Sequence, residues 1–455
     1  MRRKVPLDGG KRLSSSTHYP TTLEKGHFLG LEQSGLGSEV IGRHQNATVG
    51  LSEWHWACNL QATQAFMRIG VDATCWHNKR GYGRHARALL RALIRLNSGS
   101  RYTLVLDSME AAEPLPKECE VRVVAASAPT VKAASASGHR SLADMCRMSR
   151  ALSAKEFDIL LFPTIYSYVP TFGRARKLVM VHDVIAETFP RLTVPRLSAR
   201  LFWNIKSVLG RMQADALITV SDYSRQGILK RFGVAPQRVF VVGEAADPVF
   251  RRLPHPLPKL NLPGAGLDGS HRMVVYLGGF SPHKNLEALL AAFRRIATRN
   301  DFGDVMLLMV GDTSGDAFHT YFGTIAAQVE ALGLAGRVIF TGYLEDEEVV
   351  TLLNLASALV LPSLMEGFGL PAVEAAACGC PVIATKASPL AQLLPGGGLF
   401  VDPCETEIAR ALETLLNSKE MQLEMRAHGM AAAQRLTWEE AARQMIGVMR
   451  KVAAA

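Results

Sequence analysis

The sequence predicts an α/β protein with two Rossmann-like domains, each built on a doubly wound parallel sheet, which face each other across a cleft. From Met67 onward, short apolar runs alternate with amphipathic helical patterns, which is typical of βαβ units. A segment over residues 252–270, rich in proline and glycine and without a clear period, divides this pattern into two runs. A chain of 455 residues, 48% of them hydrophobic, is long enough for two cores.

The first 66 residues differ from the rest of the chain. They are polar and show no sustained period of either 2 or 3.6, so we expect them to be disordered or to be an extension that precedes the true start at Met67. The boundaries expected after them are an N-terminal domain over 67–255, a linker over 256–271, a C-terminal domain over 272–436 and a last helix within 437–455.

Composition excludes several classes of protein. No window has the ~18 to 20 continuous apolar residues of a membrane span, and the N-terminal residues lack a charged-then-apolar signal pattern, so we expect a cytoplasmic protein. Seven cysteines without framework spacing indicate free thiols, and no ligand spacing announces a metal site. The net charge of +10 suits anionic partners, but the basic residues are spread widely and no nucleic-acid-binding motif occurs. We therefore expect no metal and no nucleic acid.

Each expected strand is a short apolar run. In the first half these runs lie at 67–73, 102–106, 159–162, 178–181, 216–220 and 239–242. In the second half they lie at 273–277, 305–310, 338–341, 358–361 and 381–385. Because ligands of doubly wound sheets bind at the carboxyl ends of the strands, the segments that follow these runs are the candidates for function.

The strand at 273–277 leads into a phosphate-binding pattern. Gly278 and Gly279 let the backbone approach a ligand closely, Ser281 can cap the next helix, and Lys284 would then lie in its first turn. A cation is unfavourable at that positive end of a helix unless an anion binds there. The alternative is a solvated lysine after a tight turn.

The strand at 358–361 leads into the strongest motif, residues 362–374. Pro371 marks a helix start, which would place Glu374 in the first turn and leave Glu366 in a glycine-containing loop. A carboxylate can accept hydrogen bonds from both hydroxyls of a ribose, and a second one can hold a sugar ring. For Glu374 the alternative is an acid that stabilises the helix dipole.

In this context the chain resembles the retaining GT-B glycosyltransferases of the family 4 type. Glu366 and Glu374 reproduce the E-x7-E signature of that family, within G-F-G-L-P-x-x-E-A-x-A-x-G-x-P-V-I-A. The resemblance spans about residues 67–450 and implies the GT-B architecture, with the last helix crossing back to pack on the N-terminal domain. Further matching segments are Gly81-Tyr82-Gly83-Arg84, Val181-His182-Asp183-Val184, Thr219 to Ser224, Val310-Gly311-Asp312, Phe340 to Tyr343 and Val401-Asp402-Pro403.

The resemblance implies a role for each matching residue. Lys284 would neutralise the donor diphosphate, Glu374 would hold the ribose and Glu366 the transferred sugar. His182 would face that sugar from the N-terminal domain, and Tyr343 would lie near the nucleobase. Backbone amides at the donor would come from Gly278, Gly279, Gly367, Phe368 and Gly369, and the acceptor side would include Gly81, Gly83 and Arg84. The arginine that many relatives carry shortly before the lysine is replaced here by Gly278 and Gly279, so a second cation for the diphosphate is either absent or supplied from elsewhere, for example by Arg225 or His283.

The implied reaction is retaining transfer of a hexose, of mannose or glucose type, from a GDP- or UDP-sugar. The acceptor would be a hydroxyl of a glycan or a lipid-linked sugar in the synthesis of cell-surface polysaccharide, and no cofactor is expected. The alternatives are a sugar-nucleotide-binding protein without catalysis, or an epimerase or phosphorylase of the same fold.

Residues 191–211 suggest contact with an anionic membrane surface, at its inner face. Arginines and a lysine are interleaved there with leucine, isoleucine and aromatic residues, as in interfacial helices. The alternative is an amphipathic helix packed on its own sheet. The basic positions are Arg191, Arg196, Arg200, Lys206 and Arg211.

Overall fold

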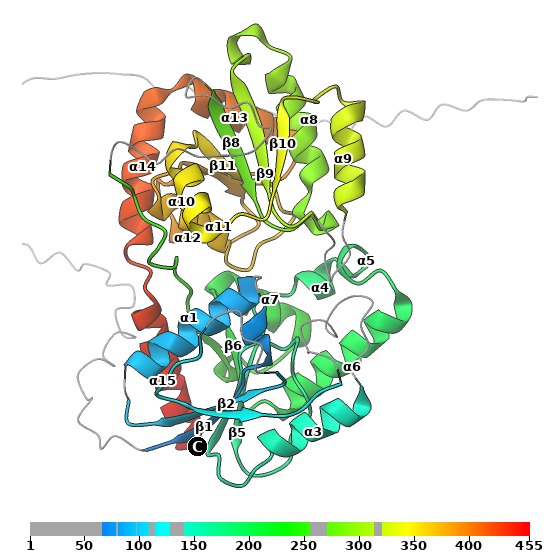
Figure 1. Ribbon diagram of the computed structural model, residues 1–455, viewed down its shortest axis with the longest axis vertical. Coiled ribbons are helices and arrows are strands. Elements are labelled where there is room, and N and C mark those ends of the chain that lie inside the picture. Colours follow the sequence, from blue (N-terminus) through cyan, green and yellow to red (C-terminus); the bar gives the residue numbers. More distant parts are fainter. Residues whose placement is uncertain are drawn as a thin grey trace, which may run out of the picture. The chain divides into compact units, whose positions relative to one another are not determined.

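Two parallel sheets organise the chain, one in each half (Figure 1). The computed structural model describes residues 66–78, 81–96, 98–108, 114–127, 141–254, 271–313 and 321–455. The expected segment 1–66, apart from Phe66, and nearly all of the expected linker lie outside these residues. Within them every strand pairing is parallel, which confirms the predicted fold class.

The first sheet has the strand order β3-β2-β1-β4-β5-β6-β7 among the described residues. Its strands are β1 (Arg68–Asp72), β2 (Arg101–Leu106), β3 (Glu120–Val123), β4 (Ile159–Phe162), β5 (Arg176–Met180), β6 (Ala216–Thr219) and β7 (Val239–Val241). The helices of this half are α1 (Gly81–Arg95), α3 (Leu142–Leu152), α4 (Ile185–Thr188), α5 (Pro190–Thr193), α6 (Leu197–Gln213) and α7 (Asp222–Phe232). Strand β3 was not predicted, because it is a partly exposed edge strand whose sequence alternates charged residues with valine.

The second sheet has the strand order β10-β9-β8-β11-β12-β13. Its strands are β8 (Arg272–Leu277), β9 (Val305–Val310), β10 (Val338–Gly342), β11 (Ala358–Leu361), β12 (Val382–Thr385) and β13 (Gly398–Val401). The helices are α8 (Leu286–Ala297), α9 (Phe322–Ala331), α10 (Asp346–Leu355), α11 (Leu370–Ala377), α12 (Leu390–Leu393), α13 (Glu405–Asn417) and α14 (Lys419–Ala433). Strand β13 was also missed, since it is an edge strand that is only partly buried.

The strand order explains why two distant sequence motifs meet. Strand β8 is followed along the chain by β9 on one side of it, whereas its other neighbour in the sheet is β11. The connections therefore leave β8 and β11 in opposite directions, and a crevice opens between them at the carboxyl ends of the strands. The loop after β8 carries Lys284, and the loop after β11 carries Glu366.

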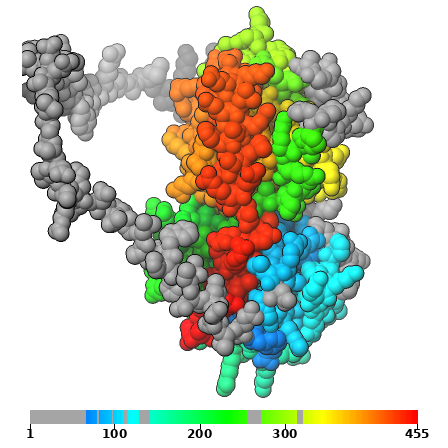
Figure 2. Space-filling view, turned by 90° about the vertical axis from the view of Figure 1, so that its left-hand side faces the viewer, coloured from blue at the N-terminus to red at the C-terminus, as the bar shows by residue number. Residues whose placement is uncertain are grey.

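Helix α15 (Trp438–Ala453) ends the chain and packs against α1 of the first half (Figures 1 and 2). The indole ring of Trp438 contacts the imidazole of His85 edge to face, with ring centroids 5.3 Å apart. The other buried positions recur at helical spacing, so one face of α15 is apolar. They are Ala441, Ala442, Met445, Ile446, Val448, Met449 and Val452.

No helix in the described part of the chain combines the length and the apolar character needed to cross a bilayer.

Candidate functional site

The loop after β8 is held in one shape by close backbone packing. Gly278 has a φ of 154°, and a Cβ there would lie 2.9 Å from the hydroxyl of Tyr276. At the end of β9, a Cβ on Gly311 would lie 2.1 Å from the Gly278 carbonyl oxygen. The two glycines are therefore required by the approach of the two strand ends, in addition to any contact with a ligand.

Lys284 lies in a 3-10 turn over Pro282–Lys284, and not in the first turn of α8 as predicted. The Ser281 side chain makes no capping hydrogen bond, and Asn285 adopts a left-handed conformation with φ 57° before α8 begins. The Asn285 side-chain amide donates to the carbonyls of Pro362 and Pro403, at 3.0 and 2.8 Å. It ties the lysine turn to the loops after β11 and β13.

Lys284 and Glu366 form an ion pair in the crevice. The ammonium nitrogen lies 2.7 Å from Glu366 Oε1, and the Ser363 hydroxyl donates to the same oxygen at 2.5 Å. Burial would raise the pKa of the Glu366 carboxyl, but Lys284 and Ser363 outweigh it and hold the pKa below its usual value. Glu366 is therefore an ionised, oriented hydrogen-bond acceptor in neutral solution.

Glu374 is the fifth residue of α11 and is buried, with 2% of its surface exposed. It does not lie in the first turn, so the helix-dipole alternative does not account for it. Its Oε1 lies 2.9 Å from the guanidinium of Arg84, which also pairs with Asp346 at 3.2 Å. Burial, with Asp346, Asp247 and Glu244 nearby, raises the pKa of Glu374 to about 7 despite the opposing effect of Arg84.

Arg84, expected on the acceptor side, thus reaches the carboxylates of the second half. Arg225 and His283, the two residues expected to supply a second cation for the diphosphate, are not suited to that role. Arg225 donates to the carbonyls of Val239 and Pro236, and burial together with Lys284 lowers the pKa of His283 to about 4. Neither residue therefore offers a second cation for a diphosphate, whereas Arg84 of the first half pairs with Glu374 and Asp346.

The Gly367–Gly369 loop contacts the first half directly. The hydroxyls of Ser221 and Ser224 donate to the Gly367 carbonyl at 2.6 and 3.1 Å. A Cβ on Gly367 would meet Asp183 Cβ at 2.8 Å, so only glycine fits. Phe368 is buried in the core, and Gly369 is left-handed with φ 87°, a conformation that favours glycine.

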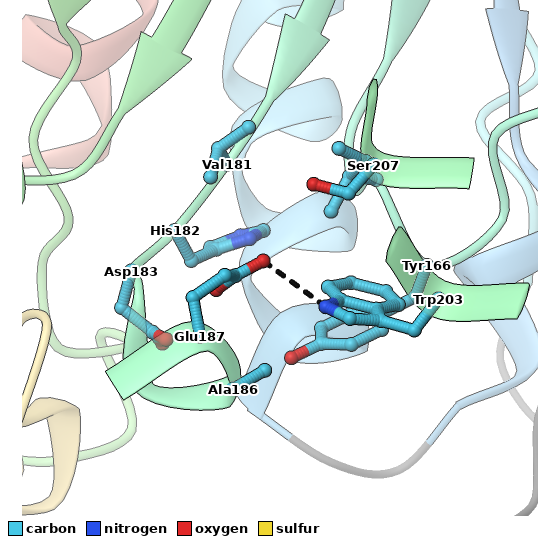
Figure 3. A pocket seen from close by; sticks show the side chains of 9 residues that line it. Tyr166, Val181, His182, Asp183, Ala186, Glu187, Trp203 and Ser207 are labelled. Carbon is cyan, nitrogen blue, oxygen red and sulfur yellow. Dashed lines mark hydrogen bonds between the residues drawn. The ribbon is translucent and has the colours of Figure 1, made fainter. Parts of the chain in front are cut away.

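His182 and Asp183 follow β5 and line a small cavity of the first half (Figure 3). Burial, with His85 nearby, lowers the pKa of His182 well below its usual value, so its imidazole is neutral. Burial raises the pKa of Asp183 to about 6. Tyr166, Glu187 and Trp203 complete the cavity, with the indole nitrogen of Trp203 donating to Glu187 Oε1 at 3.0 Å.

Aromatic rings continue from this cavity toward α1. The rings of Tyr166 and Trp203 stack with centroids 5.0 Å apart, and Tyr82 lies 5.5 Å from Tyr166. Sequence reasoning missed Tyr166 and Glu187, because neither lies in a recognised motif. Gly81 and Gly83, expected on the acceptor side, flank Tyr82 in the first turn of α1, where a Cβ on Gly83 would lie 2.0 Å from the Asn78 carbonyl.

Tyr343 follows β10 and is half exposed. It lies near the acidic residues Glu345 and Asp346 and near Arg84, all of which affect its phenol electrostatically, while burial is the main cause that raises its pKa. An exposed aromatic ring at the carboxyl end of a strand is suited to stacking on a base.

Both halves of the chain match models of known families. Residues 79–249 match the model described as Glycosyltransferase Family 4, and residues 262–431 match Glycosyl transferases group 1. The serotype-specific mannosyltransferase WbdA of Escherichia coli is 23% identical over 406 residues, covering 83% of this chain and 47% of WbdA. A D-inositol 3-phosphate glycosyltransferase of Segniliparus rotundus is 30% identical over 278 residues, covering 60% of this chain and 59% of that enzyme. The chain spans about half the length of the curated relatives it matches.

Solved structures share the fold. Sucrose-phosphate synthase from Thermosynechococcus elongatus superposes with a TM-score of 0.66 at 19% identity, covering 85% of this chain and 99% of that one. Anabaena HepE in complex with UDP-glucose superposes with a TM-score of 0.64 at 19% identity, covering 85% of this chain and 100% of HepE. Since the sheets, the crevice motifs and the family models of both halves agree, the chain belongs to the GT-B glycosyltransferases of the family 4 type.

Proposed function

We propose that this protein is a retaining glycosyltransferase that moves a hexose, of mannose or glucose type, from a nucleoside-diphosphate sugar to a hydroxyl of a glycan or lipid-linked acceptor. The observation that carries the proposal is the Lys284–Glu366 ion pair in the crevice of the second sheet, together with the buried Glu374 that pairs with Arg84. The names of relatives support it, because several are mannosyltransferases and HepE binds UDP-glucose. Cell-surface polysaccharide is the product class that these names suggest.

Each group of the donor has a matching partner. A diphosphate needs cations and amides, and Lys284 has three N–H donors, so it can contact phosphate without leaving Glu366. Glu374 would accept from the ribose hydroxyls and Glu366 from the hexose. Amides of the glycine loops at Gly278 and Gly367 would complete the contacts.

In the proposed reaction the bond between the anomeric carbon and the diphosphate oxygen breaks, and a bond from the acceptor oxygen to that carbon forms on the same face. The acceptor's hydroxyl proton passes to the departing diphosphate. Lys284 stabilises the charge that develops on the leaving group, which is the electrostatic mode of catalysis. His182 is neutral, so its imidazole can hold a hydroxyl of the transferred hexose. A neutral imidazole does not repel the positive charge that develops on the hexose ring in the transition state.

We also propose that α6 contacts an anionic membrane surface at its inner face. Only Ser207 and Gly210 of this helix are buried, and Trp203 is partly buried against the core of the first half, whereas most of the other large apolar side chains of α6 are exposed. Leu197 and Met212, at its two ends, are 77% and 73% exposed. This arrangement disfavours the alternative of an apolar face packed on the sheet. The exposed apolar residues between these ends are Leu201, Phe202, Ile205, Val208 and Leu209.

Release of nucleoside diphosphate from a panel of UDP- and GDP-hexoses tests the donor assignment. We expect one donor to release its nucleotide, faster when a glycoside acceptor is added, and the NMR spectrum of the product to show the anomeric configuration of the donor. No release from any donor, with or without acceptors, would contradict the transferase proposal, and an inverted product would contradict retention.

A further inference from the structure

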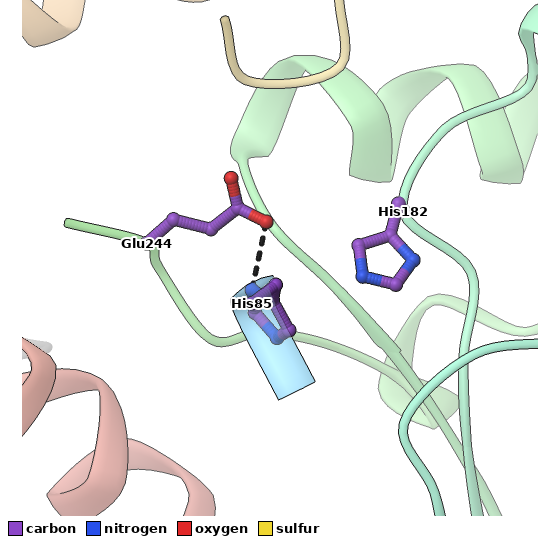
Figure 4. A group of neighbouring side chains, drawn as sticks. All are labelled: His85, His182 and Glu244. Atoms are coloured by element: carbon purple, nitrogen blue, oxygen red, sulfur yellow. Dashed lines mark ion pairs between the residues drawn. The ribbon is translucent and has the colours of Figure 1, made fainter. Parts of the chain in front are cut away.

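We propose that His85, His182 and Glu244 form a binding site for a divalent transition-metal ion of the Zn²⁺ type. The three side chains come from α1, from the segment after β5 and from the segment after β7 (Figure 4). One ligand atom of each lies within 4.8 Å of the others. No step of the transfer reaction enters the argument for this site, but His182 is also the residue proposed to hold the transferred hexose, so a bound ion would compete with the hexose for its imidazole.

Two nitrogens at this place lack partners. His85 is 1% exposed and Glu244 is 7% exposed, and Glu244 Oε1 lies 2.8 Å from His85 Nδ1. Nε2 of His85 and Nε2 of His182 are both buried without a hydrogen-bond partner. A buried polar atom without a partner is unfavourable. Nδ1 is the nitrogen of His85 that faces Glu244, so an ion shared with Glu244 and His182 would bind to Nδ1 and would give His182 Nε2 a partner.

The donor set matches one class of ion. Two imidazoles and one carboxylate are the ligands of open, four-coordinate zinc sites, in which a fourth position is left for water or another ligand. Bonds of about 2.1 Å would place these ligand atoms roughly 3.4 Å apart, so the observed group needs only small side-chain rotations. Figure 4 shows a ring nitrogen of His182 directed toward His85.

Neighbouring rings hold the His85 imidazole in place, and the site remains accessible to an ion from solvent. The His85 ring is held edge to face between the rings of His182 and Trp438, with centroids 5.0 and 5.3 Å away. His182 is only partly buried, so an ion can enter on its side. Sequence spacing could not reveal the site, because its ligands are far apart along the chain.

Zinc binding to the full, tag-free chain tests the proposal by calorimetry with Zn²⁺ alone. We expect a site that His85→Asn and Glu244→Gln each weaken at least about tenfold, the scale of losing a group that ligates or orients a metal. The control is His428→Asn, which removes an exposed histidine of α14 and should leave that site unchanged. Since residues 1–66 contain four other histidines, the difference between variants is the measured quantity.

A second measurement needs no variant. Crystals of the unaltered chain soaked in Zn²⁺ should show an anomalous peak between His85, His182 and Glu244. Equal zinc affinity in the chain and in the folded His85→Asn and Glu244→Gln variants would overturn the proposal, as would soaked crystals whose anomalous peaks lie only elsewhere.

Discussion

At the scale of single residues, the two carboxylates of the candidate site differ in charge state. Glu366 has its pKa lowered by Lys284 and Ser363, whereas the pKa of Glu374 is raised to about 7 by burial and neighbouring acids. Glu366 is therefore ionised throughout the pH range near neutrality, whereas Glu374 becomes ionised as the pH rises through about 7. Their functions should therefore respond differently to pH and to substitution.

Lys284→Ala should lower the transfer rate at saturating donor by at least about tenfold, because the developing diphosphate charge loses its cation. The measurement is the rate of nucleotide release with the best donor. Lys386→Ala is the matched control, since Lys386 pairs with Asp402 on the surface of the same half. Equal rates for the two variants would remove Lys284 from the mechanism.

The pH dependence of donor binding should follow Glu374. Below a pH of about 7 the carboxyl is protonated and has lost acceptor capacity, and above it the ionised group accepts from both ribose hydroxyls. The KM for the donor should therefore fall as pH rises through about 7. Glu374→Gln, chosen because the site is buried and a smaller residue would leave a cavity, should abolish this change. A KM profile that is unchanged in the variant would assign the titration to another group.

At the scale of elements, α15 connects the end of the chain to the first half. Its apolar face is buried and Trp438 contacts His85, so truncation after Thr437 would expose a large part of the α1 surface. We expect such a chain to be insoluble or to unfold in a single transition at much lower temperature. The single substitution Trp438→Ala should lower the free energy of unfolding by no more than about 5 kcal/mol. Calorimetric unfolding is the measurement, and a separate, unshifted transition of the first half would contradict this account.

The α6 surface gives a prediction for vesicle flotation. Arg200 and Lys206 donate to backbone carbonyls of their own half, so Arg191 and Arg196 are the exposed basic residues. We expect flotation with anionic vesicles, weakened by salt and by Arg191→Glu with Arg196→Glu, at about 1 kcal/mol for each charge.

Leu201→Ser should also reduce flotation, because the leucine is exposed and its contact is apolar. A matched substitution on the opposite half, Leu423→Ser, also replaces an exposed leucine and should have no effect. Equal flotation with neutral vesicles, or none with either kind, would contradict an anionic membrane partner.

At the scale of the whole molecule, the sequence predicted most of the framework. Strands such as β4 and β9 are continuous apolar runs buried on both faces, and their periodicity is unambiguous. The edge strands β3 and β13 are only partly buried, so their sequences lack this pattern. The predicted architecture was right because the central strands determine it.

The candidate site was less predictable than the framework. Lys284, Glu366 and Glu374 lie in short motifs, so a sequence can indicate them. The local geometry could not be predicted, because a 3-10 turn and a left-handed Asn285 separate Lys284 from α8. The contact of Arg84 with Glu374 depends on packing between distant segments, which no local pattern encodes.

The central claim is that the second half holds a nucleoside diphosphate through Lys284 and Glu374. Calorimetric titration of the full chain with UDP and with GDP, in the absence of any sugar, tests it most directly. We expect one nucleotide to bind per chain, with an affinity that falls by at least about tenfold, or ~1.4 kcal/mol, in Lys284→Ala and in Glu374→Gln but not in Lys386→Ala. Absence of binding by both nucleotides, or equal affinity in all three variants, would contradict it.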